Sequence, residues 1–344
     1  MKRVEISGRG CEKSRGEQSR GEQSRGEVRR RWRGRLATLL TASALALVVG
    51  PLAGCENTAK TSVTKATPHV TRLVKTATDD IQELERGLPK GAVLLGQELF
   101  PQEKKVEEDA GADAAAPAAN SPLGDPQELK RIIEQVRSKD ADLRVAKSTF
   151  FALADPSGKV LRNDQQQDLM AGKSLFESYP ELKAVQTTRQ PFVRTRGSMP
   201  EASGIRGRDD AQLVLASAVR QAGSASGEVK ALYVSGWSWT SYCYRLENAL
   251  KGWHQDERGE ENGKPGKMPV AYVFAVVGDQ VYGAPEAPQV NIDTVAALKV
   301  LDNTSGDSVF SKELEITERA FGVVAQRAPA LGDDVAIVIL RSET

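Results

Sequence analysis

The pattern of hydrophobic and polar residues predicts that the folded part of the chain begins near residue 126. Apolar residues recur at intervals of three and four between Leu129 and Leu143, which is the spacing of an amphipathic helix. Asp125 and Pro126 come directly before this pattern, as they do at a capped helix N-terminus. We therefore expect one long amphipathic helix in this region.

Residues 150–161 have the pattern of a β-hairpin. The apolar run from Phe150 to Ala154 meets the turn sequence Asp155-Pro156-Ser157-Gly158, and a second short apolar run follows. Asp155 is expected to cap the turn, and Gly158 is expected to adopt a positive φ. The same reasoning predicts a second hairpin that turns at Gly278-Asp279.

The rest of this region alternates helical and extended patterns. It predicts an irregular helical segment over 165–190, helices over 211–221, 241–253 and 291–301, strands over 229–239, 315–325 and 334–340, and loops over 198–210 and 256–267. In the first of these helices the expected core residues are Leu169, Met170, Leu175, Phe176, Tyr179 and Leu182. Paired strands with helices between them predict an α+β fold, in which an antiparallel sheet is flanked by helices.

The N-terminal region has the layout of a secretory signal. A cationic segment at 29–35 precedes an apolar segment at 36–51, and small residues then lead to a cysteine in Leu52-Ala53-Gly54-Cys55. The apolar segment is shorter than the roughly 20 residues that a membrane-spanning helix needs. An ordinary signal peptide with an incidental cysteine, or an uncleaved anchor, remains an alternative.

Leu52-Ala53-Gly54-Cys55 resembles the bacterial lipobox, in which the cysteine sulfur takes a diacylglycerol and cleavage makes that cysteine the new N-terminus. The resemblance implies lipidation of Cys55 and a lipid anchor in the cell membrane or outer membrane, with the chain on the extracytoplasmic side. Glu56 stands where the inner-membrane retention rule of these lipoproteins has Asp, which favours the outer membrane.

This interpretation divides the chain into five segments. They are a signal peptide (1–54), a tether rich in Thr, Lys and Ala (55–68), a short helical segment (69–100, with a helix over about 70–84), a flexible linker rich in Pro, Ala and acidic residues (101–125), and the α+β domain (126–344). Ser-Arg-Gly-Glu repeats within residues 12–27 precede the signal, so we expect translation to begin nearer Val28.

Removal of residues 1–54 changes the charge of the protein. The whole chain has a net charge of +1, but 35 basic and 41 acidic residues remain after position 54, which leaves a net charge of −6. No basic field is left to attract nucleic acid. With Cys55 modified, Cys243 is the only cysteine left, so no intramolecular disulfide is expected and Cys243 is expected in the core. Because His69 and His254 are the only histidines, we expect no zinc or copper site, and we expect no cofactor.

Two motifs near the start of the domain resemble extracellular sensor domains of the cache, PAS and GAF type. They are the turn with Asp155, Gly158 and Val160, and the run Ala171-Gly172-Lys173-Ser174-Leu175-Phe176. The resemblance covers 127–341 in element order and 150–180 by motif. It implies a sensor domain with a helical cover over a ligand cleft. Such domains normally signal through a transmembrane helix to a cytoplasmic module, and the sequence contains neither.

Aromatic residues concentrate where the predicted strand at 229–239 meets the next helix. Trp237, Trp239, Tyr242 and Trp253 lie there with Arg245. One interpretation is an aromatic corner of the core, with the Arg245 guanidinium reaching solvent. A second is a half-buried pocket in which Arg245 anchors an anionic small molecule, and a third is a surface that binds a protein.

Other groupings give weaker evidence for a site. Ser198, Ser203 and Ser235 have no positioned histidine, and surface solvation accounts for the acidic residues Glu177, Asp209 and Asp210. The main hypothesis is a lipid-anchored envelope protein whose sensor-like domain binds a small molecule or an envelope protein and is not an enzyme. The alternatives are a structural or assembly lipoprotein that docks a partner through its aromatic corner, and a hydrolytic enzyme with dispersed carboxylates.

Overall fold

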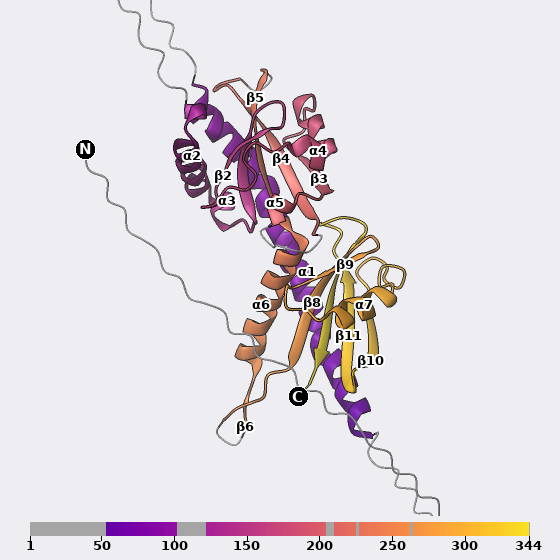
Figure 1. Cartoon of the computed structure of the whole chain (residues 1–344). Coiled ribbons are helices and arrows are strands. Elements are labelled where there is room, and N and C mark those ends of the chain that lie inside the picture. The colour runs from indigo at the N-terminus through magenta and orange to yellow at the C-terminus, as the bar shows by residue number, and fades with distance from the viewer. Residues whose placement is uncertain (1–52, 102–121, 204–209, 225–226, 262–263, 344) are drawn as a thin grey trace, which may run out of the picture. The chain divides into compact units, whose positions relative to one another are not determined.

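The computed structural model describes residues 53–101, 122–203, 210–224, 227–261 and 264–343 (Figure 1). The signal peptide predicted at 1–54 therefore lies outside the described residues apart from Ala53 and Gly54, and so does most of the linker predicted at 101–125. Within the described ranges, no helix is both long enough and apolar enough to cross a bilayer.

The first element is a single helix, α1 (Ala53–Leu99), of 47 residues. The tether expected at 55–68 and the short helix expected over about 70–84 both belong to it, so these two assignments are corrected. Apolar residues from Val70 to Leu95 form a buried stripe at helical spacing. Towards the N-terminus the same stripe continues with Ala59, Ser62 and Ala66, which are also buried. These side chains are small, so they leave little hydrophobic signal in the sequence.

A short 3₁₀ turn, η1 (Pro122–Gly124), leads into α2 (Pro126–Lys139) and α3 (Ala141–Val145). The predicted Asp125 cap is confirmed, because its side chain accepts hydrogen bonds from the backbone N–H groups of Gln127 and Glu128. The predicted single helix is divided at Asp140, whose Oδ1 accepts a hydrogen bond from the Leu143 N–H at 3.0 Å and so starts a second helix.

The first sheet contains five antiparallel strands in the order β2-β1-β5-β4-β3. The strands are β1 (Phe150–Ala154), β2 (Val160–Asn163), β3 (Val193–Gly197), β4 (Gln212–Arg220) and β5 (Val229–Ser238). The predicted hairpin is confirmed: Asp155 Oδ1 accepts hydrogen bonds from the N–H groups of Ser157 and Lys159, and Gly158 has a φ of 86°.

Several predictions in this part of the chain are wrong. Residues 211–221, expected as a helix, form β4, a strand between β5 and β3 with almost all of its residues buried. Its leucines and alanines also suit a helix, and only the sheet decides between the two. Residues 165–190 contain only α4 (Leu175–Ser178) and the 3₁₀ helix η2 (Pro180–Gln186), and α5 (Pro200–Ser203) lies in the expected loop. Leu169 is 43% exposed instead of buried.

Helix α6 (Trp239–Glu257) connects the first sheet to a second one. The second sheet has the order β10-β11-β12-β8-β9. Its strands are β8 (Val270–Val277), β9 (Gln280–Gly283), β10 (Val309–Ile316), β11 (Arg319–Arg327) and β12 (Val335–Ser342), with α7 (Gln289–Ala297) between β9 and β10. The short strands β6 (Glu260–Glu261) and β7 (Lys264–Pro265) lie in the charged loop.

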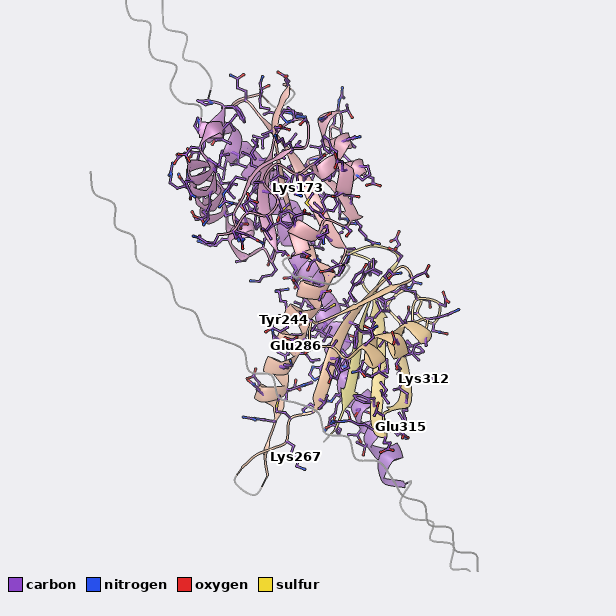
Figure 2. The ribbon with its side chains drawn as sticks, in the orientation of Figure 1. Lys173, Tyr244, Lys267, Glu286, Lys312 and Glu315 are labelled. Atoms are coloured by element: carbon purple, nitrogen blue, oxygen red, sulfur yellow. The ribbon has the colours of Figure 1, made fainter. Side chains whose placement is uncertain are left out.

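The hairpin predicted at Gly278-Asp279 is confirmed as β8 and β9. The strand predicted at 315–325 is instead a hairpin, because the chain turns at Thr317 and Glu318, where φ is 51° and 62°. Two consecutive residues with positive φ suit a tight hairpin turn, but Thr and Glu are not residue types from which such a turn is predicted. The outer strand β10 exposes charged residues, including Lys312 and Glu315 (Figure 2), which discourage pairing with another strand.

The two sheets repeat one topology. If the strands of each sheet are numbered in their own chain order, both sheets have the order 2-1-5-4-3. Residues of α1 belong to one core with the inner faces of both sheets, while the other face of each sheet packs on a separate core. The α+β class is therefore confirmed, but the single predicted sheet is corrected to two sheets joined by α1 and α6 (Figure 1).

Candidate functional site

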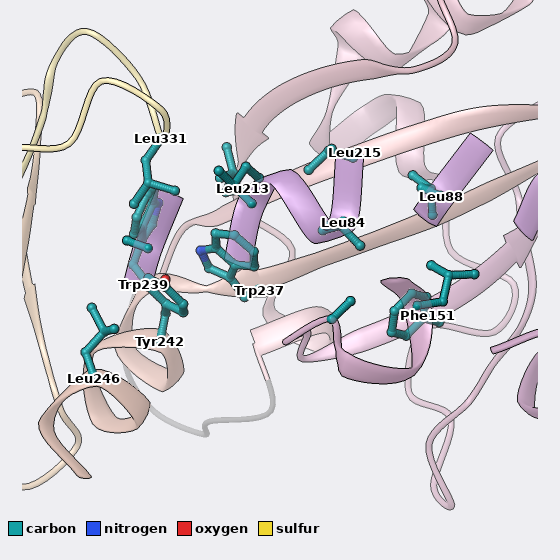
Figure 3. Packing of buried hydrophobic residues seen from close by; sticks show 14 of the residues in the cluster. Leu84, Leu88, Phe151, Leu213, Leu215, Trp237, Trp239, Tyr242, Leu246 and Leu331 are labelled. Atoms are coloured by element: carbon teal, nitrogen blue, oxygen red, sulfur yellow. The ribbon is translucent and has the colours of Figure 1, made fainter. Parts of the chain in front are cut away.

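The predicted aromatic corner lies in the core. Trp237, Trp239 and Tyr242 are each at most 2% exposed, and Trp237 stacks on Tyr242 with ring centroids 4.6 Å apart (Figure 3). Cys243 is also buried, as expected, and burial raises the pKa of its thiol. The core interpretation therefore accounts for these residues, and the three rings offer little surface to a ligand or partner.

Arg245 is occupied by a carboxylate of the chain itself. Its guanidinium binds both oxygens of Asp80 on α1, and the Tyr242 hydroxyl donates a hydrogen bond to Asp80 Oδ2 at 2.9 Å. Burial and the neighbouring Asp80 raise the pKa of Tyr242 well above its usual value, so the phenol stays a donor. This contact fastens α6 to α1 and engages the guanidinium that was expected to anchor a ligand.

Trp253 lies apart from the other predicted site residues. Its ring stacks with that of His69 at a centroid distance of 6.1 Å, and the Arg72 guanidinium lies 3.8 Å from its centroid. The five predicted residues therefore do not converge on one pocket. Trp253 instead borders a different site, built from residues that the sequence did not single out.

This site is a cavity of about 630 Å³ that we call the dihistidine cleft. Its lining comes from separate elements and includes Lys65, His69 and Arg72 of α1, His254 at the end of α6, Lys267 before β8, and Arg341 of β12. The volume is in the usual range of small-molecule sites. The cleft also brings together the only two histidines of the chain.

The two histidine rings lie edge to face with centroids 5.0 Å apart, and both residues are about 5% exposed or less. His254 Nε2 is 2.7 Å from Arg341 Nη1. Because a guanidinium only donates, Nε2 accepts this hydrogen bond, and His254 is neutral with its proton on Nδ1. His69 Nε2 is 3.1 Å from Glu257 Oε2 and donates to it.

The surroundings of both rings favour the neutral form. Burial, followed by the charge of Arg341 and the neighbouring His69, lowers the pKa of His254 to about 4. Burial also lowers the pKa of His69, although Glu257 opposes this effect. At neutral pH the pair therefore adds hydrogen-bonding groups to the cleft without adding charge.

Cations outnumber carboxylates in the lining. Five cationic side chains (Lys65, Arg72, Arg258, Lys267 and Arg341) face two carboxylates (Glu257 and Glu343). Both carboxylates are already paired: Glu343 with Lys65 and Arg341, and Glu257 with His69. Arg72, Arg258 and Lys267 form no ion pair with any residue that the structure describes. This arrangement is suited to binding an anion, because guanidinium and ammonium groups bind carboxylate, phosphate and sulfate by charge-assisted hydrogen bonds.

Sequence reasoning missed the dihistidine cleft because its residues come from four separate parts of the chain. A local signal exists, since each histidine is followed by an arginine one helical turn later, at Arg72 and at Arg258. That spacing alone does not show that the two segments meet. Among the described residues, no group of three or more His, Cys, Asp or Glu side chains is arranged to hold a metal ion.

Asp210 and Ser235, which the sequence raised as weaker candidates, have structural partners. Asp210 Oδ1 accepts a hydrogen bond from the Thr240 N–H at the start of α6, and burial raises the pKa of this carboxyl. Ser235 Oγ donates to the Phe150 carbonyl oxygen inside the first sheet. Both side chains therefore serve the fold.

No family model and no curated protein matches the chain. Solved structures similar to it are extracellular ligand-binding domains. An extracellular ligand-binding receptor from Desulfohalobium retbaense DSM5692 is 10% identical with a TM-score of 0.44, over 81% of this chain and 40% of that one, so the chain spans less than half of that receptor. The ligand-binding domain of the Pseudomonas aeruginosa PAO1 amino acid chemoreceptor PctB, in complex with L-Arg, is 12% identical with a TM-score of 0.42, over 82% of this chain and 95% of that one.

The ligand-binding domain of the Campylobacter jejuni chemoreceptor Tlp3, in complex with 4-methylisoleucine, is 10% identical with a TM-score of 0.39, over 82% of this chain and 91% of that one. Similarity at this level assigns neither a ligand nor a site. What the dihistidine cleft binds must therefore be inferred from the residues of this chain alone.

Proposed function

We propose that the protein is a lipid-anchored envelope protein whose sensor-like domain binds a small molecule through an anionic group in the dihistidine cleft. The observation that carries the proposal is the excess of cations around this cavity of about 630 Å³, in which both carboxylates are already paired. The anionic group is a carboxylate, phosphate or sulfate, since these groups share the same donors.

Two observations favour binding of a small molecule over the alternatives. The aromatic corner is buried, so an assembly protein that docks a partner through Trp237 and Trp239 would first have to open its core. Neither Glu177 nor Asp210 lines the cleft. Of the two carboxylates that do, Glu343 is held in ion pairs with Lys65 and Arg341, and Glu257 accepts a hydrogen bond from His69.

Binding is tested with sulfate, phosphate and succinate as probes on the full chain in detergent, at constant ionic strength. We expect each probe to raise the melting temperature, and at equal concentration the tighter-binding probe to raise it more, because only the native state binds it. Lys267→Gln removes one cation of the cleft and should weaken binding on the order of tenfold. The affinity is measured by isothermal titration calorimetry.

The matched control is Lys312→Gln, which makes the same change at an exposed lysine on β10, in another part of the second sheet (Figure 2). It should leave the affinity unchanged. If the two substitutions weakened anion binding equally, the loss of any one positive charge would explain the effect. That result would contradict a site in the cleft. Failure of all three probes to bind would contradict the proposed function.

Lipidation of Cys55 is the second part of the proposal, and the lipobox Leu52-Ala53-Gly54-Cys55 supports it. Two or three acyl chains on one residue would be enough for stable anchoring in the cell membrane or outer membrane. We expect mass spectrometry of the native protein to find a diacylated N-terminal Cys55. Cys55→Ser should remove this modification and release the chain from the membrane fraction. An unclipped, unacylated wild-type N-terminus would contradict the anchor.

A further inference from the structure

We infer that the dihistidine cleft takes up a proton together with its anion, and that the proton binds at Nε2 of His254. This inference rests on the proposed function, because it concerns how the same cleft accepts its ligand. It makes anion binding by this protein stronger in acidic than in neutral surroundings.

His254 contacts Arg341 through the ring nitrogen that would take up the proton. Arg341 Nη1 lies 2.7 Å from His254 Nε2, and the guanidinium has no lone pair to offer. A proton on Nε2 would therefore turn this contact into two opposed donors and two like charges. His254 can gain that proton only if something else comes between the two groups and accepts from both.

An anionic oxygen meets this requirement. It accepts one hydrogen bond from Arg341 and a second from the newly protonated His254 Nε2, in place of the bond between the two side chains. One N–H bond forms with a proton from solvent, and no other covalent bond changes. The liganded cleft then holds an imidazolium and an arginine against the charge of the anion, which favours the protonated form.

The other ring nitrogen of His254 has no partner within the described ranges that could stabilise a positive charge. Nδ1 is buried and has no hydrogen-bond partner among the described residues. A carboxylate at this position would stabilise an imidazolium from within the protein, but the described part of the chain places none there. Among the described residues, no carboxylate is therefore placed at Nδ1 to balance a protonated His254, and a bound anion would supply that counter-charge.

The groups that face His254 explain why the pair stays neutral without an anion. Four of the five cations of the cleft belong to α1, the end of α6 and β12, and the fifth lies just before β8. The groups are Lys65, His69 and Arg72 from α1, Glu257 and Arg258 from α6 and its C-terminal cap, Lys267, Arg341 from β12, and Glu343 after it. The two carboxylates are engaged with His69, Lys65 and Arg341. Burial and this surplus of cations agree with a pKa of His254 of about 4.

The experiment uses sulfate, because sulfate remains a dianion between pH 4 and 7 and cannot supply the proton itself. Calorimetry on the full chain is run at several pH values in that range, at constant ionic strength, with two buffers of different ionisation enthalpy. Over the range in which the free cleft is neutral and the liganded cleft is protonated, we expect affinity to rise about tenfold for each unit that the pH falls, with about one proton taken up per sulfate.

The site of uptake is read by NMR. The chain has only two histidines, so the ring signals are assigned with His69→Gln. We expect sulfate to move the His254 signals from the imidazole to the imidazolium position near pH 6. His254→Gln keeps an acceptor for Arg341 but cannot titrate, so it should bind sulfate with an affinity that no longer depends on pH.

The outcomes separate this inference from the proposed function. Sulfate binding that is independent of pH, without proton uptake, would overturn the inference and leave the anion site intact. Proton uptake that survives in His254→Gln and disappears in His69→Gln would overturn the assignment to His254. No binding at any pH would overturn the proposed function itself. If His254→Gln fails to fold, the wild-type NMR titration decides alone.

Discussion

Gly322→Ala should lower the free energy of unfolding by about 2 kcal/mol, although it adds only one methyl group. Gly322 lies on β11, directly under α1. A Cβ at this position would be 2.5 Å from the Val63 backbone nitrogen and 2.9 Å from the Ala59 carbonyl oxygen. Backbone atoms of a helix do not move aside as a side chain does. The helix would have to lift, and its buried stripe would lose contact with the second sheet.

The matched control for this prediction is Gly252→Ala. Gly252 is inside α6, and a Cβ there would meet nothing within 4 Å. Because alanine is a better helix former than glycine, the control should stabilise the protein by about 0.5–1 kcal/mol. Urea unfolding of both variants gives the comparison. A Gly322→Ala protein as stable as the control would mean that α1 does not rest on β11 in solution.

The same substitution bears on function, because the segment of α1 above β11 also supplies the dihistidine cleft. Lys65 lies two residues from Val63, and His69 follows one turn later. If Gly322→Ala displaces this part of α1, it should weaken sulfate binding although Gly322 does not line the cleft. The site therefore depends on the close approach of a helix that the sequence presented as a tether.

Features whose physical cause is local could be predicted from the sequence. The Asp125 cap and the turn at Asp155 and Gly158 are each fixed by a few neighbouring residues, and both are confirmed. The turn at Thr317 and Glu318 is just as local, but it uses residues that seldom adopt positive φ, so nothing in the sequence marked it. A turn can thus be predicted from the sequence only when its positions hold the residue types that favour it.

Features decided by tertiary packing could not be predicted in this way. Residues 211–221 suit a helix as well as a strand, and their position between β5 and β3 decides for the strand. The pattern of paired strands gave the α+β class but not the number of sheets, because the order of strands in a sheet depends on distant partners. The dihistidine cleft has the same origin, since α1, α6 and β12 meet only in the folded chain.

The aromatic corner shows how composition identifies a core more readily than a site. Three large rings close together predict substantial burial, and Trp237, Trp239 and Tyr242 are buried. Whether Arg245 beside them binds a ligand or an internal carboxylate depends on Asp80, which lies far away in the sequence on α1. The pairing of Arg245 with Asp80 could therefore not be predicted from the sequence.

Asp80→Ala should lower the free energy of unfolding by about 3 kcal/mol, because it removes one partner from a buried charged cluster. Asp80 is 4% exposed and binds both Arg245 and the Tyr242 hydroxyl. Arg245 is partly exposed and can turn towards water after the substitution, but the buried Tyr242 hydroxyl would lose its acceptor. Asp80→Asn keeps that acceptor and should be less damaging. Urea unfolding measures both variants.

The neighbouring residue provides the control. Asp79 is exposed and pairs with Lys75 one helical turn away, so Asp79→Ala should cost about 0.5 kcal/mol or less. Similar losses for the two alanine variants would show that the Asp80 cluster does not fasten α1 to α6.

A further comparison tests whether Arg245 anchors the ligand. Arg245→Gln should lower stability but leave sulfate affinity unchanged, whereas Arg72→Gln should weaken sulfate binding but leave stability unchanged. Weaker sulfate binding in Arg245→Gln would place the anion site at the aromatic corner and not at the two histidines.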